Sequence, residues 1–518
     1  MILLDQIRET KLIELAKSRF DPDLSEAELK VLHDSASSED PDMPAANAAR
    51  PSIRPEFVRW LVSDLEAVPL IDPKGVRVYG ATIPGKLDVR GCHVNPTLDF
   101  RYCEFQGEIN LQSAETRGLF FFDSSMAKGI RAYNVIVHGP LFLLNIQSNG
   151  EILLLGARIE DALVCNGAKL KAKKYALFAD YAKIDGGVFL RNGFESSGTI
   201  RLHSARIGVC LDFCDAKVAE VNCRNLQIGT DLIWLGIQKT KRTSLNLTGV
   251  KLKNLRDDLG SWPDLGNLIL DGLVYEELTL QPRPTDEEIK NVNLSDELPL
   301  NVDERIVWLM LQPKRRRTEP QPWMQLRDLL ERKGDRKGAK YVLFRFRCLQ
   351  AQGSWILWRW LKIAFAWLEE NPLRIGWSIL FTLTLGTAVF AGAARSGAMI
   401  ETVQIQPNMI ATYAESSKGV ARKPDEAIKP VSIHYTSFQP FIYTLENAVP
   451  LVKLGIDERW MPDLQHQPRP WFPQVGWLYW LKWLNSYGFL VWFRWLLIVW
   501  GWVQATIFAA SVADRFRK

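Results

Sequence analysis

The chain has 518 residues, of which 24% are charged and 47% hydrophobic, and its formal net charge is +5. A charge so close to neutral excludes a strongly acidic protein that imitates a nucleic-acid duplex, and the N-terminus from Met1 to Asp5 is too short and too charged for a secretory signal. The mean hydropathy of -0.08 hides an uneven distribution, since 16 of the 19 tryptophans lie at or beyond Trp308.

Residues 1–70 are predicted to form a helical N-terminal cap. Ser25 and Glu28 have the spacing of a capping box at the start of a helix. Residues 35–51, rich in Ser, Asp, Pro and Ala, have the composition of a linker. The segment 54–65 then predicts an amphipathic helix. We expect it to cover the first coil of the repeat domain that follows, because the open end of a solenoid needs protection from edge pairing.

Between Gly85 and Tyr275 one phrase, Gly-x-Φ-x-Φ-x-x-Ala-x-Φ with Φ apolar, recurs about every eleven residues. The alternating apolar positions predict strands with one buried face, and a small residue follows where backbones pass closely. The glycine ahead of each strand is expected to permit a sharp corner. The best copies are Gly85–Val94, Gly107–Thr116, Gly150–Ile159 and Gly198–Ile207.

Eleven residues are too few for a strand and a helix, so two phrases are expected to make one coil of about 22 residues. The sequence therefore predicts a right-handed β-helix over residues 71–280, with roughly eight coils. Extra residues at Lys171–Tyr175 are interpreted as a loop that protrudes from one corner. The alternative is an ordinary β-sandwich, but a sandwich does not explain why a small residue recurs at the same position of each phrase.

Residues 281–353 are predicted to be a helical linker, with helices at about 303–311, 323–333 and 336–352 and a turn at Gly334. Residues 311–349 contain twelve Lys and Arg against four Asp and Glu. We expect this basic region to face anionic lipid, with nucleic acid as the less favoured partner. Its predicted lipid-facing residues are Lys314, Arg315, Arg316, Arg317, Arg332 and Lys333.

Two uncharged runs, Ile375–Ala394 and Trp495–Ala513, have the length of membrane spans. They predict transmembrane helices within residues 373–396 and 487–513, and a basic cytoplasmic tail at 514–518. The tryptophan-dense segment 354–372 is predicted to lie in the membrane interface, with a packed amphipathic helix as the alternative. Basic residues before the first span and after the second place both termini in the cytoplasm.

The loop between the spans, residues 397–486, is then expected outside the cytoplasm. Its stretch 438–454 is apolar but too short to span, which is the pattern of a re-entrant pore helix. In that interpretation Glu446, Lys453, Gly455 and Asp457 belong to a pore loop, and Glu446 and Asp457 supply ring charges. The favoured alternative is an external helix that packs on the two spans. A Thr-Val-Gly-Tyr-Gly filter is absent from the sequence, so potassium selectivity has no support.

The sequence predicts no catalytic residue, cofactor or metal site. All seven cysteines precede the first span and are interpreted as structural thiols, and a metal at Cys210-x3-Cys214 is the less favoured alternative. The six histidines avoid both predicted spans, which excludes a pair of haem ligands within the bilayer. Glycine-rich nucleotide loops, a covalent haem motif, a zinc-protease helix and a nucleophile elbow are all missing from the sequence.

The order of these parts resembles a bacterial family of pentapeptide-like β-helix proteins with a C-terminal two-span membrane domain. That family is often labelled membrane-associated oxidoreductase, and some relatives join such repeats to a two-span potassium-channel module. The resemblance implies a location in the bacterial inner membrane, but it brings no agreed catalytic residues. The phrases that carry it are Phe57–Leu61, Pro73–Val78, Leu268–Tyr275, Pro320–Arg327 and Phe441–Gly455.

We therefore expect a membrane-anchored scaffold that displays its β-helix to an unknown cytoplasmic protein. Two spans alone bury little area, so we also expect self-association into a homo-oligomer. The first alternative is an oligomeric pore gated by the β-helix. The second is the oxidoreductase of the family label, which no motif in the sequence supports.

Overall fold

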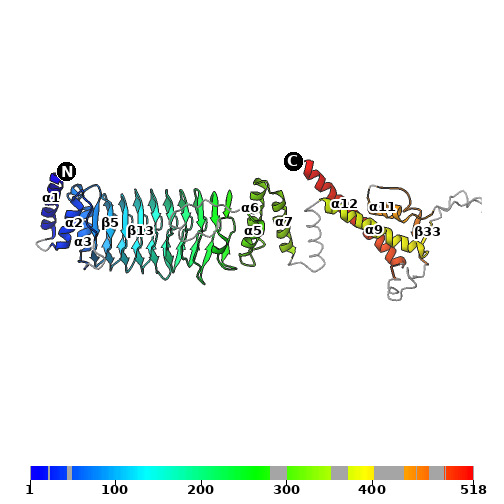
Figure 1. Cartoon of the computed structure of the whole chain (residues 1–518), viewed down its shortest axis with the longest axis horizontal. Helices are drawn as coiled ribbons and strands as arrows, with labels where there is room; N and C mark the ends of the chain where they lie inside the picture. Colours follow the sequence, from blue (N-terminus) through cyan, green and yellow to red (C-terminus); the bar gives the residue numbers. More distant parts are fainter. Residues whose placement is uncertain are drawn as a thin grey trace, which may run out of the picture. The chain divides into compact units, whose positions relative to one another are not determined.

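The computed structural model describes residues 2–20, 24–43, 49–280, 300–351, 372–401, 437–450, 452–465, 483–484 and 486–516. The chain divides into two compact units, residues 1–350 and 351–518. The first unit is a β-solenoid of about 9 turns with helices at both ends, as Figure 1 shows, so the predicted fold class is confirmed. The predicted interfacial helix at 354–372, most of the loop 397–486 and the side chains of the tail lie outside the described residues.

Within the described residues, four parallel sheets run along the solenoid, one on each side. The ten-stranded sheet contains β1 (Val76–Tyr79), β5 (Leu98–Arg101), β9 (Leu119–Phe122), β13 (Leu141–Leu144), β17 (Leu163–Val164), β21 (Val188–Phe189), β25 (Leu211–Asp212), β28 (Asp231–Trp234), β30 (Asn254–Asp257) and β32 (Glu277–Leu280). The six-stranded sheet contains β2 (Thr82–Ile83), β6 (Glu104–Phe105), β10 (Ser125–Met126), β14 (Gln147–Ser148), β18 (Lys169–Leu170) and β22 (Glu195–Ser196).

The other two sheets complete each coil. The nine-stranded sheet contains β3 (Leu87–Asp88), β7 (Ile109–Asn110), β11 (Ile130–Arg131), β15 (Ile152–Leu153), β19 (Tyr175–Phe178), β23 (Thr199–Arg201), β26 (Glu220–Asn222), β29 (Ser244–Asn246) and β31 (Leu268–Ile269). The seven-stranded sheet contains β4 (His93–Val94), β8 (Glu115–Thr116), β12 (Ile136–Val137), β16 (Arg158–Ile159), β20 (Lys183–Ile184), β24 (Arg206–Ile207) and β27 (Gln227–Ile228).

The strand register confirms the predicted coil length. Val76 pairs with Leu98, which is 22 residues further along the chain, and Leu119 pairs with Leu141 at the same interval. Between Leu163 and Val188 the interval rises to 25 residues. The extra residues lie in the predicted loop at 171–175, and the pairing of β19 with β23 shifts its register there. The insertion is therefore absorbed at one corner, and the stack continues beyond it.

The corners are turned by left-handed residues that directly precede the small buried residue of each phrase. Ser113 has a φ of 53°, and the Ala114 amide donates to the Leu111 carbonyl at 3.0 Å to close the turn. Asn, Asp and Gly occupy many of these positions, and they tolerate a positive φ better than most residues. The predicted glycine does not supply this positive φ; Gly85 and Gly107 lie in bends at another corner, between the six-stranded and the nine-stranded sheets.

The predicted glycine instead allows neighbouring coils to approach. Gly107 lies outside the left-handed region, and a methyl group on it would overlap the carbonyl oxygen of Gly85 in the preceding coil. Gly150 is placed in the same way against Lys128. These glycines thus keep the backbone-to-backbone spacing of the stack.

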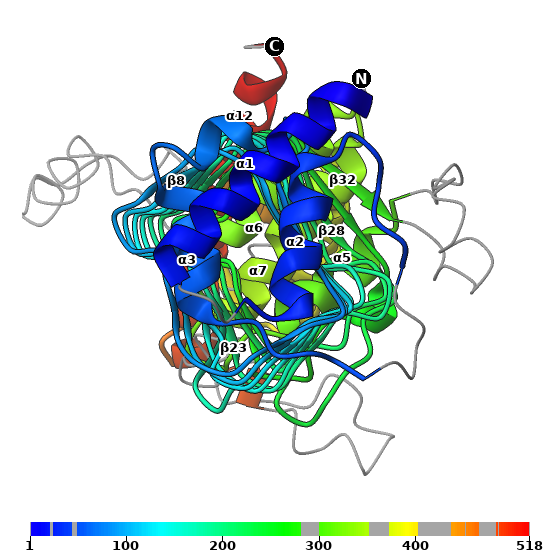
Figure 2. The ribbon, with the colours of Figure 1, turned by 90° about the vertical axis from the view of Figure 1, so that its left-hand side faces the viewer.

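Helices cover the N-terminal end of the solenoid: α1 (Ile2–Phe20), α2 (Glu26–Ala36) and α3 (Pro55–Ser63), followed by the short η1 (Val68–Leu70). Figure 2, viewed along the solenoid, shows these helices in front of the first coil. The predicted capping box at Ser25 and Glu28 is present. The buried Glu28 carboxylate also accepts two hydrogen bonds from the Arg54 guanidinium at 2.8 Å, and this partner lowers its pKa against the opposing effect of burial.

Helices α5 (Val302–Met310), α6 (Pro320–Arg332) and α7 (Arg336–Ala351) cover the other end, after the short η2 (Leu259–Ser261). Two glutamines of α6 bond to the open backbone of the last coil. Gln321 donates to the Leu273 carbonyl at 2.8 Å and accepts from the Gly272 amide at 2.8 Å, while Gln325 donates to the Tyr275 carbonyl at 2.7 Å. Side-chain amides thus satisfy backbone groups that a further strand would otherwise take.

A buried ion pair holds α5 on the solenoid. The Arg305 guanidinium donates to both carboxylate oxygens of Asp257, at 2.6 and 2.7 Å, and both side chains are 1% exposed or less. The indole of Trp262 donates to the same carboxylate at 2.6 Å. A carboxylate buried with these partners becomes strongly unfavourable if one partner is removed.

The second unit contains two long helices, α9 (Pro372–Arg395) and α12 (Tyr487–Phe516), the shorter α11 (Pro440–Ala448), and an antiparallel pair β33 (Met399–Glu401) and β34 (Trp460–Pro462). Helices α9 and α12 are long and apolar enough to cross a membrane, over residues 374–395 and 487–509. Because α12 begins at Tyr487, Arg494 lies within the apolar segment. Its guanidinium donates to Asn447 at 2.8 Å and pairs with Asp457 at 3.2 Å.

Replacing Arg305 by Met is expected to lower the free energy of unfolding of the first unit by about 3–5 kcal/mol, because Asp257 keeps its buried charge without its main partner. The control Lys86→Met removes an exposed pair with Asp88 and should cost less than about 1 kcal/mol. Urea unfolding of the detergent-solubilised chain, followed by circular dichroism, measures both. Equal midpoints for the two variants would show that the buried pair does not hold the end of the solenoid.

Candidate functional site: a basic groove on the solenoid

A row of exposed polar side chains follows one register position of the seven-stranded sheet. Arg158 pairs with Lys183, Lys183 with Arg206, and Arg206 with Gln227. An isolated bridge from Gln227 to Lys251 extends the row by one coil. Neighbouring coils are about 4.8 Å apart, so the row from Lys183 to Lys251 is about 14 Å long.

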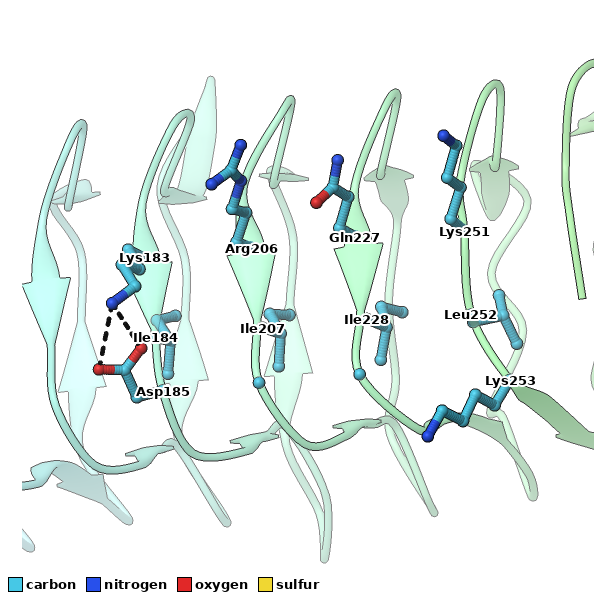
Figure 3. A pocket seen from close by; sticks show the side chains of 12 residues that line it. Lys183, Ile184, Asp185, Arg206, Ile207, Gln227, Ile228, Lys251, Leu252 and Lys253 are labelled. Carbon is cyan, nitrogen blue, oxygen red and sulfur yellow. Dashed lines mark hydrogen bonds and ion pairs between the residues drawn. The ribbon is translucent and has the colours of Figure 1, made fainter.

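Beside this row lies a groove of about 530 Å³. Its lining includes Gly208 and Gly229, which carry no side chain at the position that Asp185 and Lys253 occupy in the flanking coils. Figure 3 shows Lys183 and Asp185 at one end of the groove, Arg206 and Gln227 along it, and Lys251 and Lys253 at the other end. The two glycines thus leave the hollow open.

The charges in the groove are mostly unneutralised. Lys183 pairs with Asp185 at 3.0 Å. Arg206, Lys251 and Lys253 make no ion pair within the described part of the chain. Three free cations beside one internal pair favour an anionic ligand.

The other end of the same sheet carries alternating histidines and carboxylates. Glu115 accepts from His93 at 2.9 Å and bonds to His138 at 2.7 Å, and His138 bonds to Glu160 at 3.0 Å. The hydrogen bonds that the Glu115 and Glu160 carboxylates accept from its ring raise the pKa of His138, and the same bond lowers the pKa of Glu115. This side of the solenoid therefore changes from a mixed His–Glu ladder to a basic groove along its length.

The residues predicted to face lipid fall into two groups. Arg316 pairs with Asp271, Arg317 donates to the Gln312 carbonyl at 2.8 Å, and Arg332 contacts the Glu276 carbonyl at 3.4 Å. Arg316 and Arg332 therefore also help to hold the helices on the solenoid, whereas the bond of Arg317 stays within the segment between α5 and α6. Lys314, Arg315 and Lys333 are exposed. Contact of the basic region with lipid stays a prediction.

The predicted pore-loop residues lie close together in the second unit. The Glu446 carboxylate accepts four backbone amides, from Leu454, Gly455, Ile456 and Asp457, at 2.7–3.0 Å. Gly455 has a φ of 75°, and Lys453 is exposed. Glu446 thus anchors the turn that follows α11, while the role of these residues in a pore stays a prediction.

The cysteines are placed as structural thiols. Burial raises the pKa of Cys210 to about 11 and that of Cys214 to about 12. Thiols with such pKa values are protonated near neutral pH and are poor metal ligands. Among the described residues, no group of three or more His, Cys, Asp or Glu is arranged to hold a metal ion.

The groove is the feature that our interpretation of the sequence missed. Lys183, Arg206, Gln227 and Lys251 all occupy the residue directly after the small or apolar corner residue of their phrase. An alignment of successive phrases would have shown basic residues at this one position.

Comparison with known proteins finds no match: no protein-family model, no curated protein and no solved structure is significantly similar to the chain.

The His138 ladder predicts a measurable pH dependence. Because its pKa is raised above the ordinary 6.5, His138 stabilises the fold when protonated, and this contribution is lost as the pH rises through the raised pKa. Glu115, with a lowered pKa, loses its contribution as the pH falls. NMR titration of the full chain labelled with ¹³C-histidine, with His138→Gln to assign the signal, should give a His138 midpoint above 6.5. In the Glu115→Gln/Glu160→Gln variant this midpoint should fall, and an unchanged midpoint would contradict the ladder.

Proposed function

We propose that the chain is a membrane-anchored scaffold that presents the basic groove of its β-solenoid to an acidic segment of a cytoplasmic protein. The observation that carries this proposal is the row of unneutralised cations at Arg206, Lys251 and Lys253 beside a floor of glycines. A solenoid is a rigid ladder, so it fixes the spacing of these charges before the partner arrives.

The size of the groove favours a short extended segment. A row of about 14 Å accommodates roughly four residues of extended chain at about 3.3 Å each. Carboxylate side chains of such a segment would supply the counter-ions that the three free cations lack. Gln227 adds an amide donor within the row, between Arg206 and Lys251.

Helices α9 and α12 supply the proposed anchor in the bacterial inner membrane. The excess of Lys and Arg before α9 and the basic end of the chain support a cytoplasmic location for both termini. The exposed Lys314, Arg315 and Lys333 are proposed to contact anionic lipid, each with a contribution of about 1 kcal/mol. The resemblance to pentapeptide-like membrane proteins belongs to the same proposal. The oxidoreductase label of that family has no support from the groove, which lacks reacting groups.

Reversing two groove charges is expected to weaken binding of an acidic peptide. A fluorescein-labelled hexaglutamate peptide serves as the probe, and fluorescence anisotropy with the detergent-solubilised chain gives the Kd. Loss of two contacts of about 1 kcal/mol each in Arg206→Glu/Lys251→Glu should raise the Kd at least about 10-fold. The same charge change in Lys128→Glu/Lys171→Glu, at exposed lysines outside the groove, should leave the Kd within about 3-fold.

An equal effect of both double variants would show that the peptide senses only the overall charge, and the groove would lose its role. Tighter binding of a single-stranded oligonucleotide, with the same dependence on Arg206 and Lys251, would replace the acidic protein by nucleic acid. Both outcomes contradict the proposed partner.

A further inference from the structure

We propose that the acidic segment bound by the basic groove carries a phosphorylated serine or threonine, and that its phosphate lies over Gln227 and Gly229. These two residues belong to the third of the four coils that line the groove. The inference rests on the proposed function, because it names one side chain of the partner that the groove is proposed to bind.

The unneutralised cations of the groove surround one uncharged coil. Gln227 and Gly229 carry no charge, whereas Arg206 lies in the preceding coil and both Lys251 and Lys253 lie in the following one. Neighbouring coils are about 4.8 Å apart, so each of the three cations is one step away from this coil. Exposed Arg and Lys side chains are long enough to extend over such a step. The three positive charges are therefore able to meet at one ligand group.

The position over Gly229 is open to such a group. Glycine supplies no side chain there, and the groove of about 530 Å³ includes this position. Figure 3 shows the Lys253 side chain extended toward the coil of Gly229, and the exposed Gln227 amide stands on that same coil. Guanidinium, ammonium and amide groups together supply many hydrogen-bond donors. A phosphate, with three strong acceptor oxygens, uses these donors more fully than a carboxylate with two.

The charge of the groove matches a dianion once the neighbouring acids are included. Asp185 is paired with Lys183 at 3.0 Å, and Asp231 is paired with Arg256 at 3.5 Å. One further acid, Glu276, follows the last coil of the groove, to which its amide donates at 2.8 Å. The three free cations and this one acid leave a net charge of +2. A carboxylate neutralises half of that charge, whereas a phosphate monoester carries about −1.5 to −2 near pH 7.

Two separate carboxylates match this arrangement less well than one phosphate. Alternate side chains of an extended segment face the same side and lie about 6.6 Å apart, so only one of them fits over the coil of Gly229. A second carboxylate would then lie beside one of the flanking acids. On one side, Gly208 borders on the Lys183–Asp185 pair, which is already neutral, and on the other side Glu276 repels a negative charge. The groove therefore concentrates its free positive charge at a single position.

Fluorescence anisotropy with the detergent-solubilised chain and three fluorescein-labelled hexapeptides tests the inference. The peptides are glutamate at every position except the fourth, which is serine, glutamate or phosphoserine. At about pH 7.5 we expect the phosphoserine peptide to bind at least about 5-fold more tightly than hexaglutamate, because it adds one charge among three cations. At about pH 5.5 this preference should fall below about 2-fold, because the second pKa of the phosphate is about 6 while glutamates, with pKa values of about 4.3, stay ionised.

Lys253→Met should also reduce the preference at about pH 7.5 to less than about 2-fold, because one carboxylate then matches the remaining charge. The control Lys128→Met, at an exposed lysine outside the groove, should keep the full preference. Equal affinity for the phosphoserine and hexaglutamate peptides, or the same loss in both variants, would overturn the inference. So would displacement of the phosphoserine peptide by an equal concentration of inorganic phosphate, because the groove would then bind a free anion. If none of the three peptides binds, the proposed function itself is wrong.

Discussion

The solenoid depends on hydrogen bonds between each coil and the next. Within the described residues, successive strands on each of the four sides pair in parallel at intervals of 21 to 26 residues, so the coils keep similar lengths and similar corners. Left-handed corner residues and the glycines between coils meet this requirement, since they let the chain turn sharply and stack closely. The extra residues of the longest coil lie at a corner, at residues 171–175, where the strands on either side can still pair.

Because each coil pairs with the next, the first and last coils leave backbone hydrogen-bonding groups without a partner coil. Helices cover these groups at both ends of the solenoid. At the N-terminal end, Ser35 of α2 accepts from the Arg77 backbone amide at 3.3 Å, and at the other end the glutamines of α6 bond to the last coil. With its ends covered, the solenoid offers only its side faces to partners. The basic groove lies on one of these faces, where successive coils set the spacing of its charges.

The fold class could be predicted because apolar and small residues recur at the same positions of a phrase of about eleven residues. The capping box at Ser25 and the turn at Gly334, with a φ of 83°, also followed from local chemistry. The close approach of Gly107 to the backbone of Gly85 could not be predicted, because a sequence does not show which backbone passes nearby. The groove and the contacts of Glu446 and Arg494 depend on residues that are distant in the sequence, from 8 to 47 positions apart in the second unit. Such contacts depend on how the folded elements pack against one another, which the local sequence does not show.

The stacked register of the groove has an evolutionary consequence. Because Lys183, Arg206, Gln227 and Lys251 belong to successive coils, duplication of one coil in the gene would lengthen the groove by one charge and about 4.8 Å. Neither the covered ends nor the membrane helices would need to change. Descendants of this chain are thus able to match longer or shorter ligands by the gain or loss of whole coils, without redesign of any single contact.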